Sequence, residues 1–221
     1  MPNWTTCKLE APAEVIDKYL SKDKEGYISF DFNLVIPRPE EYNDPDLIAG
    51  GEEDFAIYWY LSDHGKISYE DLGGLRIPEK VLERYFNYFS VWHLIEKYRP
   101  ETEEDSEALY VRGSKYVRVT DLYGYRDWYD WCNANWGTKW NACDTYYDSD
   151  TGTCVEFETA WCPPMPVIEK IFKDNPGCEI KFTSYDEDYT GHYELFHDKN
   201  NEIHENTYWI DECANDYEGD F

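Results

Sequence analysis

Apolar and polar residues alternate in short runs over much of the second half of the chain, which is the pattern of half-buried β-strands. Two pairs of such runs, 141–147 with 154–161 and 190–197 with 203–209, are each separated by a few polar residues. Each pair therefore predicts a β-hairpin. The run 179–185 also alternates and predicts a strand between the two hairpins.

The N-terminal part of the chain begins with the same alternation and then changes its period. Residues 4–10 predict a short strand, 13–20 a helix with one apolar face, and 27–36 an alternating strand. These three elements predict a β-α-β opening. Between the later runs, 166–174 predicts a helix that begins at a proline and ends before Asn175-Pro176-Gly177.

The middle of the chain follows helical spacing. Residues 78–99 carry apolar side chains at helical intervals between Pro78 and Pro100, and they predict the strongest helix. Two segments stay open at this stage: 55–61 fits either a short buried strand or a helical turn, and 112–121 fits a strand or a helix.

Tryptophan is concentrated between residues 128 and 161, where it marks a helix, a tight corner and the first hairpin. Gly137 allows the corner, because glycine adopts positive φ without a steric penalty. Indole rings usually bury a large area, so we interpret this block as scaffold, more buried than exposed, and not as a binding site. The residues assigned a structural role are Trp136, Gly137, Trp140, Trp161, Pro163 and Pro164.

On these residues the chain resembles the Api92-like or YubB-like proteins (the DUF1281 group) of phages and plasmids. The resemblance rests on Asn-Trp-Gly-Thr-Lys-Trp at 135–140, on the run 157–172, and on the opening Met1-Pro2-Asn3-Trp4. The chain departs from the family pattern at Cys162, where serine is commoner, and at 5–7, where the family often has Cys-x-Asn. The resemblance implies a ferredoxin-like domain and a mobile-element setting, and it assigns no catalytic residue.

The order of the expected elements agrees with that fold. An opening strand and helix, followed later by strand, strand, helix and strand, is compatible with a ferredoxin-like antiparallel sheet that has helices on one face. We predict an α+β fold in a single compact unit, 1–221. Its parts would be a ferredoxin-like core from 1–37 and 121–210, a mostly helical insertion at 38–120, and an acidic tail at 211–221.

The charge of the chain is extreme. There are 47 acidic and 20 basic residues, a formal net charge of −27, and an aromatic content of 18% that argues against disorder. A folded surface so charged repels nucleic acids and anionic membranes and attracts basic grooves of proteins. The candidate partner-binding residues are Glu40, Glu41, Asp44, Asp46, Glu52, Glu53, Asp54, Glu103, Glu104, Asp105, Asp186, Glu187 and Asp188.

Known catalytic motifs are absent from the sequence. It contains no phosphate-binding glycine loop, no serine nucleophile elbow and no zinc-binding helix motif. His192 and His197 are five residues apart, so on a strand they face opposite sides and do not chelate one ion together. The seven cysteines lack CxxC spacing, which favours reduced thiols. We predict no enzyme activity, no metal, no cofactor and no membrane-spanning segment.

Two interpretations of the charge remain open from the residues alone. The carboxylates form a solvated surface without a partner, or they mimic the phosphates of nucleic acid in the groove of another protein. The setting implied by the resemblance favours the second. We therefore predict a counter-defence protein of the host cytoplasm, an inhibitor of a CRISPR effector, restriction enzyme or nuclease, with exposed tyrosines as anchors. The alternatives are a nucleotide-binding or small-ligand-binding module and, third, a metal-dependent hydrolase.

Overall fold

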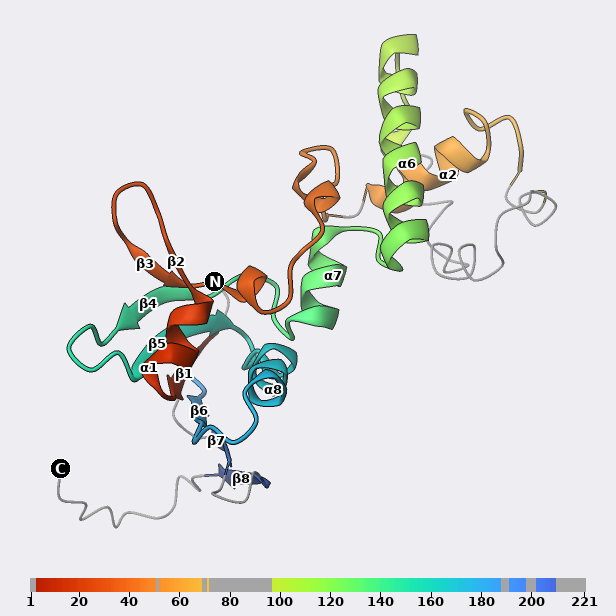
Figure 1. Ribbon diagram of the computed structural model, residues 1–221. Helices are drawn as coiled ribbons and strands as arrows, with labels where there is room; N and C mark the ends of the chain where they lie inside the picture. The colour runs from red at the N-terminus through yellow and green to blue at the C-terminus, as the bar shows by residue number, and fades with distance from the viewer. Residues whose placement is uncertain are drawn as a thin grey trace. The chain divides into compact units, whose positions relative to one another are not determined.

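The chain divides into two compact units in the computed structural model. We call Met1–Pro37 with Cys132–Phe221 the sheet unit, and Arg38–Trp131 the helical unit (Figure 1). The sequence predicts a single unit and ends the insertion at residue 120, so the structure differs in both respects. The described residues are 3–50, 52–68, 71, 97–187, 191–197 and 202–209.

A six-stranded sheet forms the centre of the sheet unit, with strand order β4-β5-β1-β6-β7-β8. Every neighbouring pair in it is antiparallel. The strands are β1 (Trp4–Glu10), β4 (Cys143–Tyr147), β5 (Cys154–Ala160), β6 (Lys181–Tyr185), β7 (Gly191–His197) and β8 (Ile203–Trp209).

Two helices connect these strands in a ferredoxin-like order. The helix α1 (Ala13–Ile16), which continues as the 3-10 turn η1 (Asp17–Tyr19), follows β1, and α8 (Met165–Asp174) joins β5 to β6. Strands β1, β4, β5 and β6 with these helices give the β-α-β-β-α-β arrangement, to which β7 and β8 are added at one edge. Figure 1 shows α1 and α8 on the same face of the sheet. The predicted α+β fold with helices on one face is confirmed.

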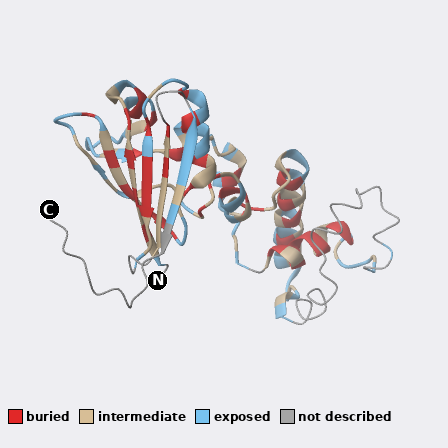
Figure 2. Ribbon diagram, turned by 90° about the horizontal axis from the view of Figure 1, so that it is seen from below, coloured by how far each residue is buried: buried red, intermediate tan, exposed pale blue. Residues whose placement is uncertain are grey.

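Alternation along β1 and β5 decides which face of the sheet is buried (Figure 2). In β1, Cys7 and Leu9 are fully buried, whereas the alternate residues Thr6, Lys8 and Glu10 are half-exposed. Val155 and Phe157 of β5 continue the same buried face. Six apolar residues of the two helices are also buried: Val15, Ile16, Val167, Ile168, Ile171 and Phe172. The core therefore lies between the sheet and its helices.

The segment 27–36 is not the single strand that its alternation predicts. Only β3 (Ile28–Phe30) is extended, and it pairs with β2 (Leu20–Lys22) in a separate two-stranded sheet. The chain then turns, because the Asp31 carboxylate accepts a hydrogen bond from the Asn33 backbone N–H at 3.0 Å and starts a 3-10 turn. The β-α-β opening is therefore wrong in its second strand.

The alternation in that segment has another cause. Phe30 and Phe32 are both completely buried, and their rings lie 4.7 Å and 5.9 Å from the ring of Phe157. The two side chains are aromatic anchors that hold a bend against the core, and their two-residue spacing imitates a strand.

The tryptophan-rich block forms the expected helix, corner and hairpin. Helix α7 (Trp128–Asn135) ends at a corner where Gly137 has a φ of 82°. A Cβ atom on Gly137 would lie 2.8 Å from Cδ of Pro166, so both the conformation and the close approach require glycine. Trp136 is 2% exposed, and its indole N–H donates to the Ile36 carbonyl at 2.9 Å. This part of the block is scaffold, as expected.

Two tryptophans of the block are instead at the surface. Trp140 is 37% exposed and Trp161 is 64% exposed, and the Lys139 ammonium lies 3.8 Å and 5.5 Å from the centroids of their rings. Trp161 has a φ of 79°, and its backbone N–H donates to the Asn3 carbonyl. The expectation that the block is buried is wrong for Trp140 and Trp161. At Trp161 the positive φ at the end of β5 turns the side chain away from the core.

The helical unit is built on the packing of α2 (Glu53–Leu61) against α6 (Glu103–Tyr123). Gly113 of α6 makes this approach possible, because a Cβ atom at that position would overlap the carbonyl oxygen of Ala56. The segments 55–61 and 112–121, which the sequence leaves open, are therefore both helical. A 3-10 turn, η3 (Glu40–Asn43), precedes them.

The helical unit ends at residue 131 because of contacts made by Tyr42. Its hydroxyl donates to the Tyr125 carbonyl at 2.7 Å, and its ring centroid is 6.3 Å from that of Trp131. These contacts hold the start of α7 to the helical unit. Residues 78–96 of the expected strongest helix and the tail 211–221 lie outside the described residues.

Candidate partner-binding surface

Seven of the predicted acidic residues of the helical unit fall into two sets, according to whether a lysine or arginine lies within ion-pair distance of the carboxylate. The first, which we call the paired set, consists of Asp44, Asp46, Glu52 and Asp54. Lys115 forms ion pairs with Asp44 and Asp46: its Nζ is 2.8 Å from the Asp44 carboxylate and 2.6 Å from that of Asp46.

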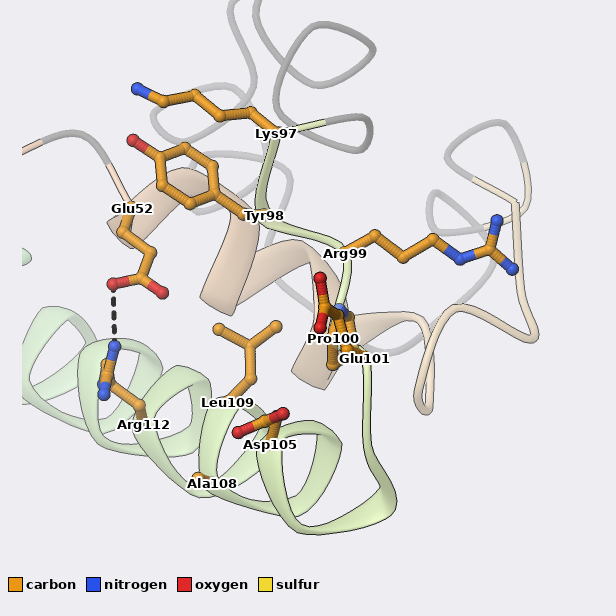
Figure 3. Close-up of a pocket in the computed structure, with 10 residues that line it drawn as sticks. All are labelled: Glu52, Lys97, Tyr98, Arg99, Pro100, Glu101, Asp105, Ala108, Leu109 and Arg112. Atoms are coloured by element: carbon orange, nitrogen blue, oxygen red, sulfur yellow. Dashed lines mark hydrogen bonds and ion pairs between the residues drawn. The ribbon is translucent and has the colours of Figure 1, made fainter.

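Two arginines form ion pairs with the other members of the paired set, Glu52 and Asp54. Nη1 of Arg112 lies 2.8 Å from the Glu52 carboxylate, as the dashed line in Figure 3 shows, and Nη1 of Arg126 lies 2.6 Å from that of Asp54. These side chains are only partly exposed, which strengthens such pairs relative to fully solvated ones. Glu53, between them in sequence, is 4% exposed. It is therefore a buried residue and does not face a partner.

The surroundings of these groups shift their protonation equilibria. The hydrogen bond from Lys115 holds the pKa of Asp44 below its usual value. Burial instead raises the pKa of Asp127, which is 2% exposed, although the Asp130 backbone N–H donates to it and Arg126 lies nearby. The paired set thus makes ion pairs within the helical unit, through Lys115, Arg112 and Arg126.

Four of the predicted residues meet at one hollow of about 740 Å³ beside α6. They are Glu40, Glu41, Asp44 and Asp46. Hydrogen bonds from its own backbone and from Tyr123 hold the pKa of Glu41 below its usual value. The structure therefore brings this sequence cluster together, but Lys115 and Arg118 line the same hollow and offset part of its charge.

The second set lies in the first turn of α6, and its two glutamates have no neutralising cation among the described residues. We call Glu103, Glu104 and Asp105 the open set, and all three are exposed. Asp105 contributes to the helix cap, because the Thr102 hydroxyl accepts from its backbone N–H at 3.1 Å and donates to its carboxylate at 2.6 Å. In the described part of the chain, no cation lies within ion-pair distance of Glu103 or Glu104.

The two sets meet at a second hollow, of about 300 Å³, drawn in Figure 3. Glu52 of the paired set and Asp105 of the open set both line it, although about fifty residues separate them in sequence. Lys97 and Arg99 also belong to its lining, and the Arg99 side chain extends away from the other labelled residues. The sequence clusters around residues 50 and 104 thus form one region of the helical unit.

The third predicted cluster lies in the sheet unit. Asp186 accepts a hydrogen bond from the Gly191 backbone N–H at 2.9 Å, which closes the end of β6 onto β7. Glu187 is exposed. Asp188 lies outside the described residues. This cluster therefore belongs to a different unit from the other two.

The cations of α6 are the functional residues that sequence reasoning missed. Arg112 and Lys115 are three residues apart, so on a helix they lie on neighbouring positions of one face. Their pairing partners are about 60 and 70 residues away in sequence. A helix predicted over 112–121 would have put both side chains on one face. Their ion-pair partners, however, cannot be predicted from the sequence.

Among the described residues, no three His, Cys, Asp or Glu side chains are placed to hold a metal ion together. Among the helices that the structure describes, none combines the length and the apolar character needed to cross a bilayer.

Comparisons with known proteins give one structural similarity. No family model and no curated protein matches the chain. A crystal structure described as the protein api92 from Yersinia pseudotuberculosis, assigned to the DUF1281 family, is similar with a TM-score of 0.41 and 9% sequence identity. The match covers 96% of this chain and 99% of that one.

Proposed function

We propose that this chain is a non-enzymatic binding protein whose helical unit occupies the basic, nucleic-acid-binding groove of a host defence protein. The observation that carries the proposal is the open set of α6. Its glutamates are exposed without a cation in the described part of the chain, whereas the neighbouring paired set is neutralised from within. The open set therefore leaves its charge for a partner.

The physical basis is long-range attraction followed by contact. A net charge of −27 steers a basic protein toward the chain and repels nucleic acid. Carboxylates on an exposed helical turn then take the positions of phosphates against lysine and arginine side chains. Competition of this kind inhibits a nuclease or effector without any chemistry at the inhibitor.

A second physical role of the same residues must be separated from this one. Acidic side chains in the first turn of a helix stabilise it, because they face the positive end of the helix dipole. This role needs no partner. The decisive measurement is therefore partner binding with stability measured alongside.

The setting of the proposed function comes from the sequence. The resemblance to the Api92-like family supports a phage or plasmid setting for the chain, and the proposal puts its partner in the host cytoplasm. A CRISPR effector, a restriction enzyme and a nuclease are the partner classes to which this proposal applies.

The test is a competition assay with labelled DNA or RNA bound to one member of each partner class. The wild-type chain should displace the nucleic acid from at least one of them, and displacement should weaken as salt rises from about 0.05 to 0.5 M because the contact is electrostatic. The variant Glu103→Gln/Glu104→Gln should displace it at least about tenfold less well, since two charge-assisted contacts are lost.

The matched control is Glu14→Gln/Glu25→Gln, which removes the same charge from exposed positions of the sheet unit. This control should compete like the wild type. The proposal is rejected if no protein of the panel releases its nucleic acid to the wild-type chain. It is also rejected if the α6 variant and the control compete equally, because the effect would then come from net charge alone.

A further inference from the structure

A groove of about 570 Å³ lies in the sheet unit between α8 and the strands β7 and β8. It exists because β7 and β8 extend the sheet at one edge, beyond the four strands of the ferredoxin-like core (Figure 1). Its volume is within the range of small-molecule sites, about 300 to 1,000 Å³. It involves none of the residues of the proposed function, and the inference drawn from it is independent of that proposal.

The floor of the groove is apolar. Phe172 of α8 and Leu195 of β7 line it and are almost completely buried, and Ile203 of β8 lines it while remaining 56% exposed. An exposed isoleucine beside a buried phenylalanine and leucine offers a surface on which the apolar part of a ligand displaces water.

One polar group in this floor lacks a hydrogen-bond partner among the described residues. His197 lines the groove and is 5% exposed, with its ring centroid 4.7 Å from that of Phe172. Its Nδ1 is buried and makes no hydrogen bond to any described residue. A buried imidazole nitrogen without a partner costs stability, and such groups in native proteins call for an explanation. A ligand that donates a hydrogen bond would supply one.

The rim of the groove is acidic on two sides. Glu169 of α8 and Glu205 of β8 line it from opposite elements, and both are exposed. Both charges act on Tyr193: burial raises the pKa of the Tyr193 hydroxyl, and the negative charges of Glu205 and Glu169 raise it further. Lys173 is the cation among the lining residues, so the rim carries net negative charge.

We propose that this groove binds a small organic amine. The ammonium group lies between Glu169 and Glu205, the apolar body packs on Leu195 and Ile203, and the buried nitrogen of His197 accepts a hydrogen bond from the ligand. Anionic ligands such as nucleotides are disfavoured by the same two carboxylates. The apolar floor selects amines with a hydrophobic body over fully polar polyamines.

The experiment uses the full chain and two probes, tryptamine and tyramine, with calorimetry and chemical-shift mapping. At least one amine should bind and shift the signals of Leu195 and Ile203. Tryptophol and tyrosol, which carry a hydroxyl in place of the ammonium, should bind at least about tenfold more weakly, because the charged contacts are lost. If neither amine binds, or if the neutral analogues bind as tightly, the proposal is overturned.

Matched variants locate the site. Glu169→Gln and Glu205→Gln should each weaken amine binding several-fold, whereas Glu14→Gln, which removes the same charge from α1 outside the groove, should not. His197→Phe keeps an aromatic ring and removes the unpartnered nitrogen, so it should weaken binding while the melting temperature stays level or rises. Equal effects of Glu14→Gln and the groove variants would show unspecific attraction to an acidic protein and would overturn the proposal.

Discussion

The paired set and the open set of the helical unit look alike in the sequence and differ in the structure. Both are runs of carboxylates in an acidic stretch. Asp44, Asp46, Glu52 and Asp54 each lie within 2.8 Å of a lysine or arginine nitrogen, whereas Glu103 and Glu104 are exposed with no such partner in the described part of the chain. A count of acids therefore measures the charge of a segment but not the charge available to a partner.

The difference arises from the position of α6. Its middle and the turn that follows it carry the cations Arg112, Lys115 and Arg126, which reach back to the paired set. The charged residues of its first turn are all acidic. The region of α6 thus neutralises the paired set and leaves the open set exposed. Mutations at the paired set should therefore lower stability, whereas mutations at the open set should lower partner binding.

The largest effect on stability is expected for Arg126→Met. This change leaves Asp54 without its cation and removes the arginine next to Asp127, which is almost fully buried. Removing one member of a largely buried charge network should cost about 2 kcal/mol, a value reduced for the partial exposure of Arg126. Urea unfolding monitored by tryptophan fluorescence gives the measurement.

The control for that prediction is Lys66→Met, in which the lysine of a pair with Asp63 is 70% exposed. It should change stability by less than about 0.5 kcal/mol. Equal costs for Arg126→Met and Lys66→Met would contradict the structural role given to the paired set.

A smaller loss is expected for Lys115→Met. This lysine is shared by Asp44 and Asp46, whose side chains are 30% and 45% exposed. Its loss leaves two unneutralised carboxylates and should lower the free energy of unfolding by about 1 kcal/mol. The loss should be smaller at high salt, because salt screens exposed charges. The measurement is urea unfolding at 0.05 and 1 M salt. A cost that does not change with salt would point to lost packing of the lysine stem.

The dependence of folding stability on pH in the acid range should also reveal the ion pair between Lys115 and Asp44. The pKa of Asp44 is lowered in the folded chain from the ordinary value of 3.8, chiefly by the hydrogen bond from Lys115. Its contribution to stability is therefore fully present above pH 3.8 and is lost as the pH falls through the lower folded-state pKa. Unfolding measured from pH 5 to 2.5 should be less steep in Lys115→Met than in the wild type. Parallel curves would exclude this linkage.

The smallest effect on stability is expected for Glu103→Gln/Glu104→Gln. The two charges interact with the α6 dipole and with no cation in the described part of the chain, so their removal should cost about 0.5 kcal/mol. The measurement is the urea midpoint, compared with the competition assay on the same preparation. A loss as large as that of Arg126→Met would assign these residues a structural role and remove the contrast between the two sets.

Much of the sheet unit could be predicted from the sequence. The strand 4–10, both hairpins, the α8 helix and the Gly137 corner follow from alternation, proline and glycine, because these patterns are set by neighbours in the chain. The segment 27–36 misled the same reasoning, since Phe30 and Phe32 alternate for a tertiary reason.

The sequence by itself determined the fold class, the residues of the corner and the net charge, because local pattern, backbone chemistry and composition are properties of the chain alone. Only the tertiary structure decided which carboxylates are neutralised, that Trp161 is exposed while Trp136 is buried, and that His197 lies beside an acidic rim. The physical reason is distance. Ion pairs, burial and grooves depend on contacts between residues far apart in sequence, such as Lys115 with Asp44, and no local pattern specifies such partners.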